Sequence, residues 1–454
     1  MIETAEAGAR AEAPPPRFVV GSTMRHVVVM TATGSVGLIA IFTVDLLSLL
    51  YISWLGDPRL TAAVGFATIV LFLATSINVG LMIAIGALVS RTLGAGERAR
   101  ARRLGGSTCT HGALTALVVA AVLLAFLPSL LGLLGAAPDT LATAQRFLWI
   151  TLPSNVFLAV GMAFSGVLRA VGDARRAMYV TLSGAIVTVF LDPLLIFGAG
   201  LGVDGAAIAT VVSRMLFAFV GFHGAARIHD LVAWPRLEDL AADFRPMFAI
   251  AGPAVLTNVA TPAGGAFFAG VVARFGNEAI AGTAIIDRLV PVAFGGIFAL
   301  SGAIGPILGQ NWGARRFDRM RRILRDGVLF LAVYVGVVWL VLLVLRLPLI
   351  HVFNLSGLAA ELVGFYCLIS GPTWLFLGLL FLANASFNNL GFPVLSTLFN
   401  WARATFGTVP FALVGAKLGG PEGALLGVTA GAVLFGLGAI VAAFWTIDRL
   451  ERRA

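Results

Sequence analysis

The sequence predicts an all-α integral membrane protein, with twelve transmembrane helices in two six-helix bundles, and three observations carry this prediction. The chain of 454 residues is 59% hydrophobic and 12% charged, with a mean hydropathy of +0.97. Soluble domains carry about 25% charged residues, so a soluble protein could not bury this much apolar surface. Twelve apolar stretches can each cross a bilayer, and the second half of the chain repeats motifs of the first.

The expected spans follow one another along the chain, each at least as long as the ~20 residues that cross the hydrocarbon core. In the first half they cover 28–55, 60–92, 107–134, 139–170, 175–199 and 203–227. In the second half they cover 246–275, 279–309, 320–348, 358–390, 393–417 and 421–447. Several are longer than a perpendicular span requires, so we expect tilted or kinked helices. The 53 glycines fit helices that approach closely or bend.

Domain boundaries follow from these spans. Residues 1–26, "MIETAEAGARAEAPPPRFVVGSTMRH", lack the basic-then-apolar order of a signal peptide and predict a disordered cytoplasmic tail. An N-terminal six-helix lobe is expected over 27–227 and a C-terminal six-helix lobe over 246–448. A charged cytoplasmic linker, 228–245, joins them, and 449–454 form a second cytoplasmic tail.

The distribution of arginines predicts the orientation, because cytoplasmic loops are enriched in basic residues. If the N-terminus is inside, most of the 31 basic residues lie in cytoplasmic segments, and the outside loops hold only Arg59, Arg274, Arg346 and Lys417. We therefore expect a multi-pass protein of the bacterial cytoplasmic (inner) membrane with both termini cytoplasmic. The net charge of +9 is explained by loops that face anionic lipid, so no nucleic-acid partner is expected.

An internal repeat relates the two halves. "SRTLGAGERARARRL" (90–104) resembles "GQNWGARRFDRMRRIL" (309–324). At an offset of 219 or 220 the pairs are Gly94 with Gly313, Pro153 with Pro372, Gly172 with Gly391, and Gly56 with Gly276. Six spans per half give both halves the same orientation, which places a pseudo-two-fold axis along the membrane normal and a substrate path between the lobes. Two lobes that can rock suit alternating access better than a channel.

Two acids interrupt the apolar spans. Asp45 lies in "FTVDLLSLLYISWLG" and Asp192 in "FLDPLLIFG", and a charge at the bilayer centre costs about 2.5–3.5 kcal/mol on insertion scales. The repeat places no acid at the matching positions, near Gly265 and Val409. This asymmetry favours a coupling-ion site in the N-terminal lobe. The alternatives are a helix-packing role for Asp45 and, because a proline follows it, a helix-breaking role for Asp192.

The paired "LVSRTLGAGERARARR" and "ILGQNWGARRFDRMRR", with "LRAVGDARRAM" and "LDPLLIFGAGLGVDGAAIATVVSR", resemble the multidrug and toxic compound extrusion (MATE) family. The resemblance implies a V-shaped pair of bundles and secondary active export of drug-like, often cationic or amphipathic molecules, driven by H⁺ or Na⁺. In relatives of the archaeal and DinF-like type the cation lies between acids that match Asp45 and Asp192. Neighbouring polar positions match Ser165, Thr188 and Thr210.

The sequence departs from that family pattern in two places. Hydroxyls stand at Ser165 and Thr188 where such relatives often carry Asn, which favours H⁺ over Na⁺, because hard cations prefer several strong oxygen ligands. Met30 stands where the family often has a proline, so a bend of the first helix would have to use Gly34 or Gly37.

Other polar residues carry weaker predictions. Asp287 and Arg288 are expected to neutralise one another, or Asp287 serves as a counter-charge in the C-terminal lobe. Four polar residues are expected to form interhelical hydrogen bonds or to line the substrate path: Asn258, Thr261, Asn384 and Asn388. Phe42 and Phe157 are candidates for lining the cavity. The histidines near span ends, His111, His223 and His351, are expected to be unpaired. We expect no metal site and no cofactor.

Two other functional classes share part of this sequence pattern. A lipid-linked oligosaccharide flippase of the same superfamily would need a cationic cavity, and only four arginines fall mid-span: Arg146, Arg214, Arg288 and Arg403. A gated channel or membrane receptor would lack coupled transport. "TLGAGERA" is not followed by the Lys-Ser/Thr of a phosphate loop and no nucleophile triad is visible, so we expect no enzyme. The best prediction is a monomeric antiporter of small organic substrates.

Overall fold

The computed structural model describes residues 15–453, and every regular element in this range is a helix. Ten of these helices or helix runs are long and apolar enough to cross a membrane. The count is eleven if Asn277–Ala293 and Gly295–Gly313, which meet at a bend of 45°, form one span. The prediction of an all-helical membrane protein is confirmed.

In the first half, each expected span coincides with one helix or helix run. The elements are α1 (Thr23–Ser53), α2 (Pro58–Gly94), α3 (Arg98–Ala125), α4 (Leu127–Leu133), α5 (Pro138–Thr151), η1 (Leu152–Ser154), α6 (Asn155–Val171), α7 (Ala174–Pro193), η2 (Leu194–Gly198), α8 (Gly202–Phe222) and η3 (His223–Ile228). The α7 helix widens into the π-helical η2 directly after Pro193, which lacks the N–H that would continue the ladder.

The second half follows the same plan up to its last helix. The elements are α9 (Leu237–Val272), η4 (Ala273–Phe275), α10 (Asn277–Ala293), α11 (Gly295–Gly313), α12 (Phe317–Val352), α13 (Gly357–Phe365), η5 (Tyr366–Ser370), η6 (Gly371–Thr373), α14 (Trp374–Leu390), α15 (Pro393–Ala402), η7 (Arg403–Gly407) and α16 (Val409–Glu451). Helix α16 is interrupted at Gly419 and Gly420, whose backbone angles are not helical. A Cβ added to Gly415 would lie 2.0 Å from the Gly423 carbonyl oxygen, so the chain turns back on itself here.

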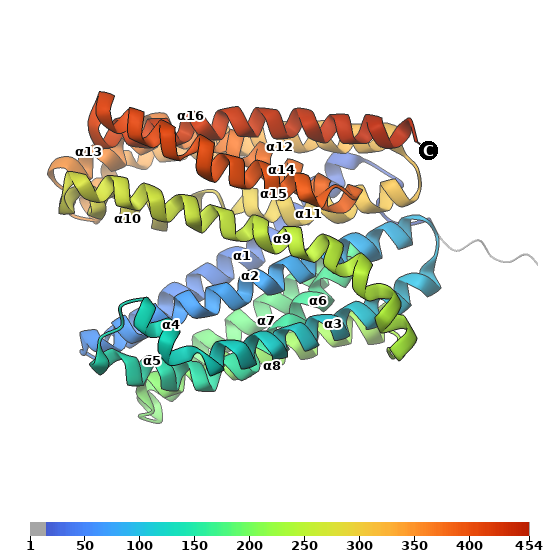
Figure 1. Ribbon diagram of the computed structural model, residues 1–454, viewed down its shortest axis with the longest axis horizontal. Coiled ribbons are helices and arrows are strands. Elements are labelled where there is room, and N and C mark those ends of the chain that lie inside the picture. The colour runs from blue at the N-terminus through green and yellow to red at the C-terminus, as the bar shows by residue number, and fades with distance from the viewer. Residues whose placement is uncertain (1–14, 454) are drawn as a thin grey trace, which may run out of the picture.

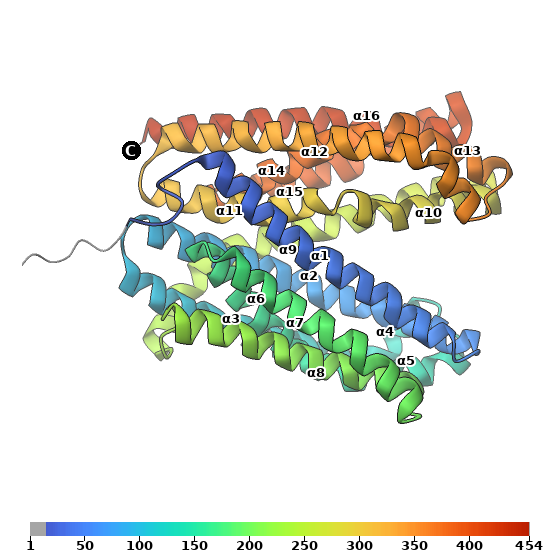
Figure 2. The same cartoon turned by 180° about the vertical axis from the view of Figure 1, so that it is seen from behind.

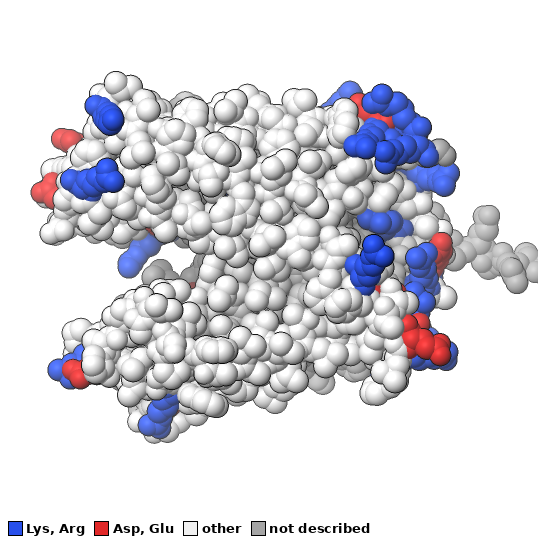
Figure 3. All heavy atoms as spheres, viewed as in Figure 1, with Lys and Arg blue, Asp and Glu red and all other residues white. Residues whose placement is uncertain are grey.

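The helices form two groups, α1–α8 and α9–α16, which lie side by side in Figure 1. Figure 3 shows a hollow between the groups at one end of the molecule, and lysines and arginines gathered at the other end, where the groups meet. Two helices, α1 and α9, contact both groups. Helix α1 packs on α11 and α12 as well as α7, and α9 packs on α2 and α3 as well as α15 and α16 (Figures 1 and 2).

Residues paired by the sequence repeat occupy matching structural positions. Gly172 and Gly391 end α6 and α14 with φ of 92° and 86°, a left-handed conformation that glycine adopts without strain. Gly56 and Gly276 take φ of 79° and 94° in the turns before α2 and α10. The prolines of the repeat both fall in short 3₁₀ turns, η1 and η6.

The remaining pair, Gly94 and Gly313, lies where α2 and α11 cross. A Cβ on Gly94 would come within 2.0 Å of the Gln310 carbonyl oxygen, and one on Gly313 within 2.0 Å of the Arg91 carbonyl oxygen. The repeat pairs Arg91 with Gln310 as well, so these two contacts are reciprocal. The repeated glycines therefore let the two halves touch backbone to backbone at the basic end.

The segment between the halves is attached to α3. Leu231 is fully buried, the Ala233 N–H donates to the Arg102 carbonyl, and Asp230 forms an ion pair with Arg102. The expected linker 228–245 is only partly non-helical, because α9 begins at Leu237.

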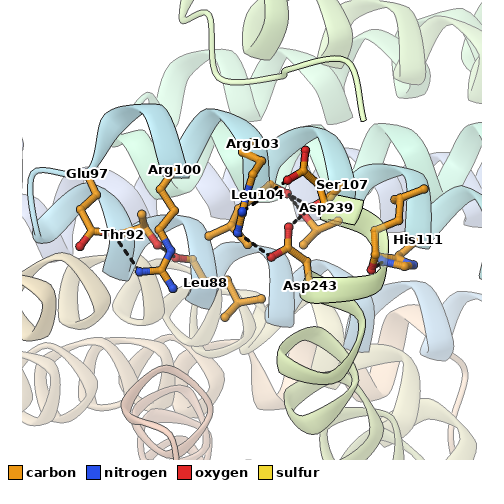
Figure 4. A network of polar contacts seen from close by, with 12 residues as sticks. Leu88, Thr92, Glu97, Arg100, Arg103, Leu104, Ser107, His111, Asp239 and Asp243 are labelled. Atoms are coloured by element: carbon orange, nitrogen blue, oxygen red, sulfur yellow. Dashed lines mark hydrogen bonds and ion pairs between the residues drawn. The ribbon is translucent and has the colours of Figure 1, made fainter. Parts of the chain in front are cut away.

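Figure 4 shows how α9 begins against α3. Buried Asp243 accepts from Arg103 at 3.0 Å and from Ser107 at 2.5 Å. His111 Nε2 lies 2.9 Å from the Leu240 carbonyl oxygen. A buried carboxylate is tolerated here because charged and hydroxyl donors satisfy it.

The expected disordered tail, 1–26, needs a correction at its end. Residues 1–14 lie outside the described part of the chain, but Phe18 is 1% exposed and its N–H donates to Gln310 Oε1 at 2.8 Å. Arg17 donates to the Gly172 carbonyl, and α1 already begins at Thr23. Burial of the Phe18 side chain stabilises this segment, although most of the residues around it are polar or small.

Candidate functional site

The two acids predicted for the N-terminal half lie on neighbouring helices. Asp45 projects from the middle of α1, and Asp192 is the second-last residue of α7, the helix on which α1 packs. Asp192 is 1% exposed, whereas Asp45 is exposed. The carboxylate of Asp192 accepts a hydrogen bond from Ser48, and its Oδ1 has no partner among the described residues.

Ser48 connects α1 to Asp192 through this hydrogen bond. It lies three residues after Asp45 on α1, and residues at this spacing share a face of a helix. Asp45 and Asp192 interact electrostatically with one another. Ser48 is therefore hydrogen-bonded to the buried Asp192 and shares the face of α1 that carries Asp45. Ser48 was not predicted, although its spacing from Asp45 within the quoted stretch is a visible signal.

Arg214 on α8 is the second unpredicted member of the cluster. Its Nη1 donates to the Thr151 carbonyl at 2.9 Å and to Ser154 Oγ at 3.0 Å, which ties it to the break between α5 and α6. It interacts electrostatically with Asp45. An arginine in mid-span is a functional candidate by default, and this signal was present in the sequence.

The three hydroxyls predicted beside the acids make other contacts. Thr188 Oγ1 donates to the Gly184 carbonyl at 3.0 Å and Thr210 Oγ1 to the Ala206 carbonyl at 2.9 Å, both within their own helices. Ser165 Oγ is buried and has no hydrogen-bond partner in the described part of the chain. The structure thus shows a hydrogen bond to the acids from Ser48 and none from these three residues.

The predicted substrate-path residues fall into different surroundings. Asn258 on α9 donates to the Ser76 carbonyl of α2 at 3.3 Å, which is a contact between the two halves. Asn384 is buried and accepts from Asn400 at 2.9 Å, and Asn388 accepts from Ser396 at 3.1 Å. Phe157 is 40% exposed. The expectation of interhelical hydrogen bonds is met by the asparagine contacts.

The expected neutralisation of Asp287 by Arg288 is wrong for the described structure. Both side chains are exposed, and no ion pair joins them in the described range. Adjacent residues on a helix point about 100° apart, so a direct pair is geometrically unfavourable.

The second half carries a buried cation of its own, at a position that does not match either acid of the first half. Arg403, at the start of η7, is 8% exposed. Its Nη2 donates to Thr261 on α9 at 3.3 Å, and its Nε has no partner among the described residues. In residues 15–453 no three His, Cys, Asp or Glu side chains are grouped as a metal site would require.

A polytopic helical chain with ionisable residues in its spans and a hollow between two helix groups has the features of a membrane transporter. A family model described as MatE matches residues 35–194 and again 253–414. These matches cover more than half of the sequence, so the chain belongs to the MatE family of transporters.

Relatives and solved structures agree with this assignment. The FAD transporter of Shewanella oneidensis is 27% identical over 90% of this chain and 91% of its own length. The multidrug export protein MepA of Staphylococcus aureus is 25% identical over 74% of this chain and 76% of its own length. The bent form of the Vibrio cholerae MATE transporter VcmN, at 25% identity, superposes with a TM-score of 0.90 over 95% of this chain and 98% of that structure.

Proposed function

We propose that this protein is a secondary active antiporter that exports small organic molecules in exchange for protons by alternating access. One observation carries the proposal: two carboxylates, Asp45 and Asp192, lie on the packed helices α1 and α7, with Ser48 of α1 hydrogen-bonded to Asp192, inside one helix group of a MatE-family transporter.

The architecture we infer has twelve spans. The bent pair α10–α11 serves as one span, and the run Pro393–Glu451 (α15, η7 and α16) serves as two, because the chain reverses at Gly419–Gly420. Two six-helix lobes, 27–227 and 246–448, then face the same way around an axis along the membrane normal. The double match of the family model and the matching positions of the repeated glycines support this arrangement.

The orientation follows from charge. The basic end in Figure 3 faces the cytoplasm, with both termini on that side of a bacterial inner membrane. The hollow at the opposite end then opens outward, and the crossing of α2 and α11 closes the inner end. This describes an outward-facing state of an antiporter that we infer to be monomeric.

Charge balance favours a proton as the coupling ion. Arg214 keeps its charge, so with both carboxylates ionised the cluster carries one excess negative charge. One proton neutralises it and needs no shell of ligands, whereas a sodium ion needs several oxygens and is repelled by the guanidinium. Ser48 hydroxyl can pass a proton between exposed Asp45 and buried Asp192.

Coupling requires that proton and cargo favour different states of the protein, because a ligand with equal affinity for both shifts nothing. A proton entering from the hollow neutralises the cluster and removes the charge that would oppose repacking of α1 on α7. After the cargo is released into the hollow, a proton binds to the acids. The lobes then change arrangement, and the proton leaves on the cytoplasmic side. Asp287, Asn258, Asn384 and Phe157 are our candidates for the cargo path.

The test is transport in proteoliposomes with each gradient imposed separately. We expect uphill movement of a cationic dye such as ethidium when only a proton gradient is present. Dye transport that requires Na⁺ at equal pH on both sides overturns proton coupling. A channel is revealed if the protein only dissipates a dye gradient and never builds one.

A second cargo class is favoured by Arg403. A buried arginine with no carboxylate partner among the described residues is costly unless an anion joins it. Together with the relative named FAD transporter, this suits an organic phosphate as cargo. The test is uptake of FAD into inverted vesicles by the wild type and by Arg403→Gln. Loss of FAD uptake with ethidium transport retained supports it, and equal transport of FAD by both proteins excludes it.

A further inference from the structure

Residues 15–22, which precede α1, lie at the end of the molecule where the two helix groups meet, and we call them the N-terminal strap (Figure 2). The Phe18 N–H donates to Gln310 Oε1 at 2.8 Å. The Phe18 carbonyl accepts from Asn311 Nδ2 and from Arg319 Nη2, both at 3.1 Å. These three partners lie near the end of α11 and in the first turn of α12, so the strap is bound to the second half.

The strap is also joined to the first half, at the C-terminal end of α6. Arg17 Nη1 donates to the Gly172 carbonyl at 2.8 Å, and Gln310 Nε2 donates to the Ala170 carbonyl at 2.7 Å. The last carbonyls of a helix have no partner within it and favour cationic donors. Gln310 therefore holds the strap with its side-chain oxygen and α6 with its side-chain nitrogen, so hydrogen bonds connect the strap, α11 and α6 to one another.

The hydrogen bond between α11 and α6 has a counterpart in the other half. The sequence repeat, at an offset of 219, pairs Gln310 with Arg91 and Ala170 with Asn389. Arg91 Nη2 donates to the Asn389 carbonyl at 3.1 Å, as Gln310 does to Ala170. Each half thus sends one side chain to the matching helix end of the other half, and this pair of bonds belongs to the repeated scaffold.

The docking of the strap is not repeated in the other half. The same offset pairs residues 16–18, "PRF", with residues 235–237, "PRL", so each half has a proline, an arginine and an apolar residue before its first long helix. Phe18 is 1% exposed, whereas Leu237 is 85% exposed. The repeated scaffold therefore does not require this docking, and the docked strap is a feature of the first half alone.

We propose that the N-terminal strap is a latch that holds the inner end of the transporter closed. This inference rests on the proposed alternation of the two lobes, but not on the coupling ion or the cargo. Opening the inner end separates α6 from α11. Phe18 makes three backbone hydrogen bonds to the second half, so the strap stays there and the Arg17–Gly172 bond breaks. A contact that exists only in the closed form favours that form.

The experiment measures the distance between two spin labels on the full chain in nanodiscs. The labels are attached at Arg100→Cys on α3 and Arg322→Cys on α12, two exposed positions in different halves at this end, after Cys109 and Cys367 are replaced by alanine. A short distance reports the closed inner end and a long distance the open one. Arg17→Gln should raise the ratio of long to short distances about threefold to tenfold, because its hydrogen bond is charge-assisted but partly exposed to solvent.

Arg25→Gln is the matched control, because Arg25 is an exposed arginine close to the strap whose side chain makes no hydrogen bond or ion pair with the described residues. It should keep the wild-type ratio, and Arg17→Lys, which retains a charged donor, should lie between the wild type and Arg17→Gln.

An unchanged ratio in Arg17→Gln, even with a lower unfolding temperature, would make the strap a structural contact only and overturn the latch. An equal rise in Arg25→Gln would overturn it as well. A single distance in every variant, at pH 5 and at pH 8, would count against the alternation of the lobes itself, and the latch would fail with it.

Discussion

Replacing Arg214 by glutamine tests whether this arginine balances the charge of the candidate cluster. The guanidinium makes two hydrogen bonds, to the Thr151 carbonyl and to Ser154 Oγ, and we propose that it balances the charge of Asp45. Glutamine can keep one neutral hydrogen bond but leaves Asp45 and Asp192 without a counter-charge. Because Asp45 is exposed and the contacts at stake are hydrogen bonds of a charged group, we expect a loss of about 1.5–3 kcal/mol.

The assay is thermal unfolding in detergent, followed by proton-driven dye efflux at matched protein levels. Since each kcal/mol shifts the midpoint of a large domain by about 2–4 °C, Arg214→Gln should melt several degrees lower. Efflux should fall at least about tenfold, which corresponds to about 1.4 kcal/mol. Arg146→Gln is the control, because its ion pair with Asp204 leaves Arg146 73% exposed and such pairs contribute at most about 1 kcal/mol.

A second substitution separates charge balance from simple loss of contacts. Asp45→Asn in the Arg214→Gln background removes one of the two uncompensated charges, so the double variant should be more stable than Arg214→Gln alone. Strict additivity of the two effects, or an Arg214→Gln protein that melts and pumps like Arg146→Gln, would refute the proposed cluster.

Three further predictions follow from the structure. Asp45→Asn and Asp192→Asn should fold and insert but lose gradient-driven efflux, while Asp287→Asn keeps a substantial fraction of it; wild-type efflux by Asp45→Asn at a normal expression level would make that carboxylate structural. Gly94→Ala should lower the free energy of unfolding by about 1–3 kcal/mol, because its Cβ would lie 2.0 Å from the Gln310 carbonyl oxygen. Gly65→Ala on the same helix is the control, since its Cβ would meet nothing within 4 Å. Equal melting temperatures of the two variants would contradict this packing. The pKa of Asp173 lies below its usual 3.8, because hydrogen bonds from His229 and Arg176 outweigh the desolvation that raises it; its stabilisation should be present above about pH 4 and lost as the pH falls through the lowered value, a loss that a melting series with Asp173→Asn should not show.

Much of the fold could be predicted from the sequence because a bilayer allows few solutions. A long apolar stretch in a bilayer satisfies its backbone groups as a helix, and ten or eleven of the twelve expected spans are distinct membrane-length helices or helix runs in the described structure. The repeat pairs were visible because glycine and proline serve backbone positions that other residues fill poorly, as Gly172 and Gly391 do at their helix ends.

Other features depended on contacts that no local pattern reveals. Phe18 lies in a polar tail by composition, yet it is buried beside Gln310, a residue distant in sequence. Asp287 and Arg288 are adjacent in sequence but point apart on the helix. Ser48 and Arg214 carry signals in the sequence, yet only the packing of α1, α7 and α8 shows that they belong with Asp192 and Asp45.

The two halves share a scaffold but differ in charge, and this difference matters for coupling. Their repeated glycines build the same turns and the reciprocal crossing of α2 and α11. The first half adds a carboxylate pair, of which one member is buried and one exposed, and the second half adds the buried cation Arg403. If both halves held the same ionisable group, a proton would bias each lobe equally and give no preference for one arrangement of the pair. In the mechanism that we propose, protonation of the carboxylate pair changes the first lobe alone, so the equilibrium between the two arrangements of the lobes can respond to a single proton.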